Sequence, residues 1–129
     1  MNKRTFLILC LLLTIGISYA AAYEAKKRAG EYEVEIRIDK NPPVVGENNL
    51  KIEIKDPAGR PITDSRVLVN YYMPPMPRMA PMNYRTDARL KGEHYRATMR
   101  LIMAGPWYIV VIITREGKTS TAKFTIDAR

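Results

Sequence analysis

The chain has 129 residues, of which 47% are apolar, and it carries a formal net charge of +8. This length is typical of one domain that buries a core without disulfides or a structural metal. One cysteine, Cys10, and one histidine, His94, are too few for a disulfide framework or a zinc site made of Cys and His ligands.

Residues 1–22 are predicted to be a signal peptide that forms a hydrophobic helix before the folded domain. Lys3 and Arg4 provide a positively charged start, and the uncharged apolar run that follows contains the single cysteine. The run ends in small residues that suit cleavage after Ala20 or Ala22. Removing this segment leaves a chain with no cysteine, and therefore no thiolate ligand and no cysteine nucleophile.

The alternative is that residues 5–22 stay in place as an anchor in the inner membrane. A spanning helix needs about 20 apolar residues, and this stretch is slightly shorter, which favours cleavage. In both cases the remainder is expected to be exported to the periplasm. The positive charge then indicates solubility or attraction to an anionic membrane surface, and nucleic acid is not expected as a partner.

Residues 23–30 are expected to be a flexible lead-in, and residues 31–129 are expected to form the domain. Apolar and polar residues alternate with period two through almost all of it, which predicts half-buried strands. Turn sequences separate the strands, and no segment has helical periodicity. About seven strands are expected, over residues 31–39, 49–56, 66–72, 83–92, 94–103, 107–115 and 121–127.

The same alternation predicts the buried face of each strand. Short strands at turn spacings of about 8–12 residues indicate an all-β, immunoglobulin-like, two-sheet antiparallel β-sandwich. Trp107 is expected to anchor the core between the sheets. The predicted inward side chains are Tyr32, Val34, Ile36, Ile38, Leu50, Ile52, Ile54, Val67, Val69, Tyr71, Tyr95, Ala97, Met99, Leu101, Met103, Trp107, Ile109, Val111, Ile113, Ala122, Phe124 and Ile126.

The titratable residues do not suggest an enzyme. His94 is expected to begin a strand on the face opposite Tyr95, as a partly exposed polar residue. Carboxylates fall mainly on outward positions or in turns, and the chain has no glycine-rich phosphate loop, no HExxH motif and no nucleophile elbow. A non-enzymatic protein is therefore predicted.

The segment YYMPPMPRMAPMN, residues 71–83, places methionines at a strict spacing of three. A thioether is soft and uncharged, suits Cu(I) or Ag(I), and survives in an oxidising compartment where thiols would pair. The chain requires no cofactor, but it offers a candidate site for either ion. The candidate metal ligands are Met73, Met76, Met79 and Met82, with Met103 and His94 as residues that could complete the site.

Three interpretations of this segment remain open from the residues alone: a soft-metal site, packing over the core and docking of a partner. Its prolines favour polyproline II, in which side chains three residues apart begin roughly 9 Å from one another and form a stripe rather than a site. A folded-back loop could instead bring the sulfurs together around a metal. The methionines could also pack over the open end of the sandwich, or form an adaptable docking surface for a partner.

The order of three segments resembles the YtkA-like domain family, which is related to the FixH proteins. These segments are the strand-and-turn sequence from Asn49 to Val69, the methionine–proline segment, and the stretch GEHYRATMRLIMAGPW, residues 92–107. The resemblance covers about residues 47–128 and implies a small secreted or membrane-anchored immunoglobulin-like domain.

Family resemblance also implies a role in copper or heavy-metal homeostasis. Possible partners are metal-efflux components or the assembly machinery of haem–copper oxidases. Members often carry a histidine in or just after the methionine–proline segment, whereas this chain has Arg78 and Asn83 there. A Cu(I) site of methionines alone, or no metal, is therefore expected. The alternative to a metal-homeostasis role is a structural interaction module with no ligand.

Overall fold

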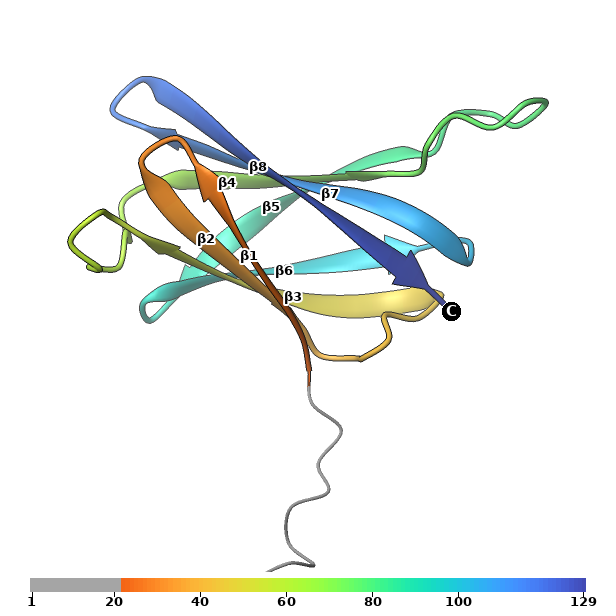
Figure 1. Ribbon diagram of the computed structural model, residues 1–129, viewed down its shortest axis with the longest axis horizontal. Helices are drawn as coiled ribbons and strands as arrows, with labels where there is room; N and C mark the ends of the chain where they lie inside the picture. Colours follow the sequence, from red (N-terminus) through yellow and green to blue (C-terminus); the bar gives the residue numbers. More distant parts are fainter. Residues whose placement is uncertain (1–21) are drawn as a thin grey trace, which may run out of the picture.

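The computed structural model describes residues 22–129, which form eight β-strands and no helix (Figure 1). Within this range no helix is long and apolar enough to cross a membrane. Apart from Ala22, the predicted signal peptide lies outside the described residues. The strands are β1 (Tyr23–Ala29), β2 (Tyr32–Ile38), β3 (Gly46–Lys55), β4 (Arg66–Tyr72), β5 (Asn83–Lys91), β6 (His94–Leu101), β7 (Gly105–Arg115) and β8 (Lys118–Ala128).

The first strand corrects one expectation, because residues 23–30 were predicted to be a flexible lead-in. They form β1 and the start of the turn to β2, with which β1 pairs along its whole length. Ala29 is buried, and Tyr23 and Ala25 pack against the core. Ion pairs also cross to β2: Lys26 Nζ lies 3.5 Å from a Glu35 carboxylate oxygen, and Arg37 Nε lies 3.3 Å from one of Glu24. Hydrophobic alternation is weak in this stretch, so it did not predict a strand.

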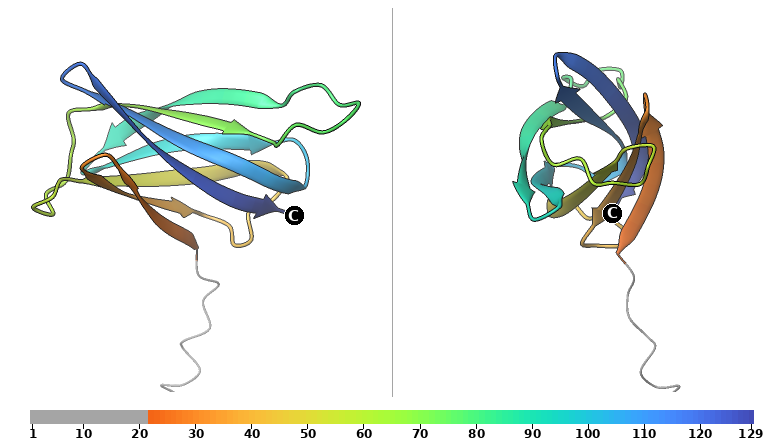
Figure 2. Two further views of the ribbon diagram at one scale, coloured as in Figure 1. Left: turned by 45° about the horizontal axis from the view of Figure 1, so that its top comes forward. Right: turned by 90° about the vertical axis from the view of Figure 1, so that its left-hand side faces the viewer.

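All eight strands are antiparallel, and hydrogen bonds join them in the order β1-β2-β3-β6-β5-β4-β7-β8. β5 connects the two halves of the sheet, because it pairs with β4 along residues 83–88 and with β6 only through residues 89–91. The sheet curls until β1 lies beside β8, where the Tyr23 hydroxyl donates to the Thr125 carbonyl oxygen at 3.4 Å (Figure 2).

These pairings confirm the all-β, antiparallel prediction and change its details. The structure has eight strands instead of about seven, and they form one nearly closed sheet instead of two separate sheets. The difference lies at β5. The sequence predicted it as a weak edge strand, but its two halves pair with different neighbours and so connect what would be two edges.

The interior of the curled sheet is the hydrophobic core. Every side chain predicted to face inward is buried except Met103, which is half-buried against the core. Trp107 is fully buried, as predicted, and its indole N–H donates to the Met103 carbonyl oxygen at 2.9 Å. Period-two alternation therefore predicted the core well, because each strand buries one of its faces.

One buried polar residue, Asn48, holds the loop between β2 and β3. Its side-chain oxygen accepts from the Val44 N–H at 3.0 Å, and its amide donates to the carbonyl oxygens of Val44 and Gly46 at 2.7 and 3.1 Å. A buried amide with partners at both ends carries no unsatisfied hydrogen-bonding group. This loop lies at the same end of the molecule as the C-terminal residue, whose N–H donates to the Pro43 carbonyl oxygen at 2.9 Å.

Candidate soft-metal site

The segment from residue 73 to residue 82 projects from one end of the sheet as the loop between β4 and β5 (Figure 1). It folds back on itself, because the Met73 N–H donates to the Met82 carbonyl oxygen at 3.1 Å. At its tip the Met79 N–H donates to the Met76 carbonyl oxygen at 3.3 Å, and Arg78 has a positive φ of 66°. Pro77 followed by a residue of positive φ is the pattern of a type II turn.

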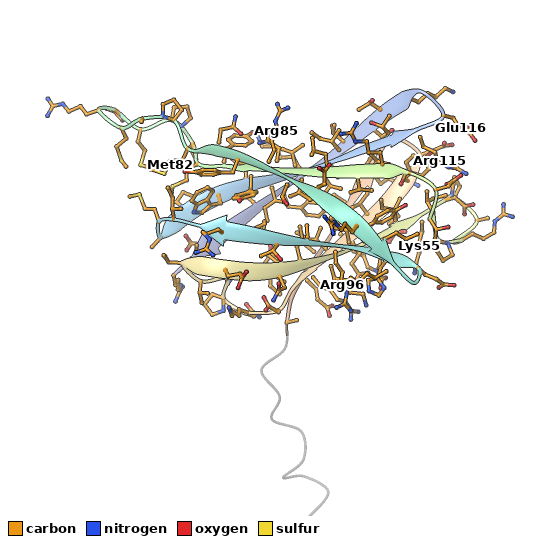
Figure 3. The ribbon with its side chains drawn as sticks, turned by 180° about the vertical axis from the view of Figure 1, so that it is seen from behind. Lys55, Met82, Arg85, Arg96, Arg115 and Glu116 are labelled. Atoms are coloured by element: carbon orange, nitrogen blue, oxygen red, sulfur yellow. The ribbon has the colours of Figure 1, made fainter. Side chains whose placement is uncertain are left out.

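This fold brings the predicted methionines to one pocket of about 240 Å³. The polyproline stripe is therefore wrong, because the tip turns the chain and returns it alongside itself. Figure 3 shows Met82 at the base of the loop, where the chain re-enters the sheet. The pocket is lined by Tyr72, Met73, Pro74, Pro75, Met76, Met79, Ala80, Pro81, Met82 and Asn83, and is called the methionine pocket below.

The methionines of the pocket differ in their exposure. Met73 is 6% exposed and belongs to the core, whereas Met79 is 42% exposed at the loop tip. Met76 and Met82 are intermediate and pack against the core. Thioethers thus extend from the buried end of the sheet to the exposed tip of the loop.

Met103 lies at the same end of the molecule, in the turn between β6 and β7. It does not line the methionine pocket, but Gly105, two residues further on, touches one of the pocket residues. A Cβ at Gly105 would lie 3.2 Å from Met73 Cε, and Gly105 has a φ of +121°, so space and backbone both favour glycine there. The sequence marked this glycine only as part of a turn.

His94 lies at the opposite end of the sheet from the methionine pocket, so the predicted completion of the site by His94 is wrong. It begins β6 opposite Lys91, at the turn that follows β5, whereas the loop precedes β5. Its half-buried position on the face opposite Tyr95 agrees with the sequence prediction. Burial, followed by the charges of Lys51 and Arg96, lowers the pKa of the imidazole below its usual value.

Aromatic rings gather at the base of the loop. The rings of Tyr71 and Tyr84 stack with centroids 5.5 Å apart, and each lies close to Trp107, at 6.2 and 6.3 Å respectively. The sequence identified Trp107 and Tyr71 as core residues but not Tyr84, because β5 lacks a clear alternation. The cluster fixes the strands from which the loop departs, so the base of the pocket is rigid.

The donors available at this end suit a soft monovalent ion. The pocket offers thioethers and no carboxylate, imidazole or thiolate. Residues 22–129 contain no group of three or more His, Cys, Asp or Glu side chains that could hold a metal ion. Thioether ligands select Cu(I) over the harder divalent ions, and the residues present therefore fit Cu(I) or Ag(I).

Comparison with known proteins gives one match. The family model described as YtkA-like matches residues 24–111, a range that includes β1 and β2 as well as the methionine loop. No curated protein and no solved structure matches the chain.

Proposed function

The chain belongs to the YtkA-like family, and on that premise we propose that it is an exported, non-enzymatic accessory protein of copper or heavy-metal homeostasis. In this proposal the methionine pocket binds Cu(I), or the similar ion Ag(I), as cargo. We interpret the nearly closed sheet as an immunoglobulin-like β-sandwich whose two halves are joined along β5. The ion would pass to or from a partner in metal efflux or in the assembly of a haem–copper oxidase.

One observation carries the proposal: the loop returns on itself, so that its evenly spaced methionines line a single pocket. Even spacing in an extended chain would separate the sulfurs, whereas the turn at residues 76–79 removes that separation. The exposed Met79 supports capture of an ion from solution, and the buried Met73 supports a fixed inner ligand. Neither capture of the ion nor its inner coordination requires a residue that titrates near neutral pH.

The same loop also supports the alternative, a structural module with no ligand that docks on a partner. Met73, Met76 and Met82 pack against the core, as methionines that only fill a gap would do. The two functions differ in what the sulfur atom does, since leucine can replace the bulk of methionine but cannot bind Cu(I).

Titration with Cu(I) against a competing chelator, under reducing and oxygen-free conditions, tests the proposal. Replacing Met73, Met76, Met79 and Met82 together by leucine is expected to weaken Cu(I) binding at least 100-fold, roughly the loss of the whole soft donor set. The matched control is Met99→Leu, which removes a fully buried thioether outside the loop and should change the affinity less than about twofold.

The fluorescence of the only tryptophan reports whether the variants keep the fold, because Trp107 lies in the aromatic cluster at the base of the loop. An unchanged Cu(I) affinity in the folded leucine variant would overturn the site. Failure of the wild-type protein to bind Cu(I) or Ag(I) at all would favour the structural module.

A further inference from the structure

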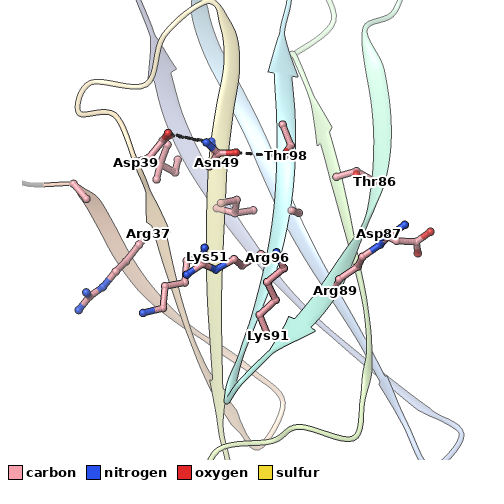
Figure 4. Close-up of a pocket in the computed structure, with 14 residues that line it drawn as sticks. Arg37, Asp39, Asn49, Lys51, Thr86, Asp87, Arg89, Lys91, Arg96 and Thr98 are labelled. Carbon is pink, nitrogen blue, oxygen red and sulfur yellow. Dashed lines mark hydrogen bonds between the residues drawn. The ribbon is translucent and has the colours of Figure 1, made fainter.

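The outer surface of the sheet carries a row of positively charged residues that only the strand register reveals. Across β2, β3, β6 and β5, Arg37 lies opposite Lys51, Lys51 opposite Arg96, and Arg96 opposite Arg89. Figure 4 shows the four side chains spread along one line across the strands. With neighbouring strands about 4.8 Å apart, the row is about 14 Å long.

A row of this kind opposes folding, since like charges directly opposite each other on adjacent strands are destabilising. Carboxylates offset the positive charge at one end of the row, because Arg37 Nε lies 3.2 Å from a Glu35 oxygen and Lys51 Nζ lies 3.3 Å from a Glu53 oxygen. At the other end, Arg89 and Arg96 face each other, and within residues 22–129 neither has an acidic partner within 4.0 Å.

The row lines an open pocket of about 860 Å³ on the outside of the sheet, called the basic pocket below. Lys91 adds a fifth cation to its wall, and Asn49 and Thr98 add polar groups. The wall also contains Asp39 and Asp87, so the five cations exceed the carboxylates by three. Asp39 accepts from the Asn49 N–H and side-chain amide at 2.9 and 3.0 Å, and Asp87 lies 3.9 Å from an Arg66 nitrogen.

We propose that the basic pocket binds an oxyanion of the phosphate class that carries several negative charges. The guanidinium groups of Arg89 and Arg96 would each present two parallel N–H donors to its oxygens, the geometry that arginine offers to phosphate. A ligand with charges spread over about 14 Å matches the row better than a single compact ion. The pKa of His94 is lowered first by burial and then by Lys51 and Arg96, and the second part agrees with a positive potential at this place.

This inference does not depend on the proposed copper function, because the basic pocket and the methionine pocket share no lining residue. The phosphate groups could belong to either of two kinds of molecule, a soluble polyphosphate-like anion or the headgroups of anionic lipids. The chain therefore needs to be offered both, as inorganic tripolyphosphate and as vesicles of phosphatidylglycerol.

The first measurement is calorimetric titration of the purified full chain with inorganic tripolyphosphate at low salt. The R89Q/R96Q variant is expected to bind at least tenfold more weakly than the wild type. R85Q/R100Q is the matched control: it removes the same charge from exposed positions on the same two strands, outside the pocket, and should change the affinity less than about twofold.

The second measurement compares co-sedimentation of the wild type and the two variants with phosphatidylglycerol and phosphatidylcholine vesicles, and the N-terminal segment is identical in the three proteins. Extra retention on phosphatidylglycerol that R89Q/R96Q loses and R85Q/R100Q keeps would identify lipid headgroups as the source. Tripolyphosphate binding with that same pattern, and no extra retention, would identify a soluble anion. Equal losses in the two variants, or no binding to either probe, would overturn the proposal.

Discussion

The two pockets of this domain are chemical opposites. The methionine pocket, of about 240 Å³, is lined by uncharged residues, mainly methionines and prolines, and lies at the end of the core. The basic pocket, of about 860 Å³, lies on the outer face of the sheet and is rich in arginine and lysine. The first pocket is made by residues close in the sequence, and the second by residues that only strand pairing brings together.

That difference has consequences for stability. Met73, Met76 and Met82 of the methionine pocket contribute to the core, so truncating them should destabilise the fold. The cations of the basic pocket repel one another, so removing them should not. A series of substitutions can test this contrast, beginning with the largest expected effect.

Trp107→Ala should reduce the free energy of unfolding by about 3–5 kcal/mol, because it removes a fully buried indole and leaves a cavity. It also removes the donor to the Met103 carbonyl oxygen. Urea denaturation measures the loss. Arg96→Ala on the outer face should stay within about 0.5 kcal/mol of wild type. Similar losses of stability in Trp107→Ala and Arg96→Ala would contradict the expected difference between the core at the base of the loop and the outer face of the sheet.

Within the methionine pocket, Met73→Ala should cost about 2–3 kcal/mol of stability, since Met73 is 6% exposed. Met79→Ala, at a position 42% exposed, should cost less than about 0.5 kcal/mol. If the pocket binds Cu(I), Met79→Ala should nevertheless weaken Cu(I) binding. Thermal unfolding and chelator competition measure the two quantities separately, and a stability loss at Met79 as large as at Met73 would show that the loop is packed throughout.

R89Q/R96Q should raise the stability of the unliganded protein by about 0.5 kcal/mol at low salt, by removing repulsion between residues directly opposite each other. The gain should fade in 1 M NaCl, where the Debye length is about 3 Å. Urea denaturation at the two salt concentrations checks this. A loss of stability at low salt would mean that the arginines are held by contacts that outweigh their repulsion.

The smallest effect concerns the protonation of His94, the only imidazole in the chain. Its pKa is lowered in the folded state by burial and then by Lys51 and Arg96, so the folded protein favours the neutral form. Its contribution to stability is present above the usual histidine pKa of about 6.5 and is lost as the pH falls from there through the lowered pKa. His94→Gln should remove this part of the pH dependence.

An NMR titration of the His94 ring distinguishes the two pockets. An anion in the basic pocket should raise the pKa of His94, because it offsets the neighbouring cations. Cu(I) in the methionine pocket, at the other end of the sheet, should leave the pKa unchanged. Binding of tripolyphosphate with no change in this pKa would place the anion elsewhere.

The sequence predicted most of the fold because the interior is built by simple alternation. Every residue predicted to face inward is buried except Met103, which is half-buried, whereas Asn48 in β3 and Ala128 in β8 are buried and were not identified. β1 was missed because the basic run from Lys26 to Arg28 obscures the alternation of the residues that contact the core. β5 was predicted as an edge because its alternation is weak, whereas its two halves pair with different strands.

The candidate site was predicted less completely. Methionine spacing identified the residues of the pocket, but proline content suggested an extended chain, and only the turn around Arg78 shows that the loop returns. Gly105 and Tyr84 were not identified, because their roles depend on contacts between distant segments. The cation row could not be predicted at all, since it requires the register of four strands.

The strand order also affects how fast the chain folds. Short turns join β1 to β2, β5 to β6 and β7 to β8, but β3 pairs with β6 and β4 pairs with β7, and each of these two pairs is separated by two other strands in the sequence. Sheets dominated by such distant pairings fold in roughly milliseconds to seconds, far more slowly than helical bundles of similar length. During that interval the apolar faces of β3 and β6 are uncovered, so a newly made chain is prone to aggregate until the pairing forms.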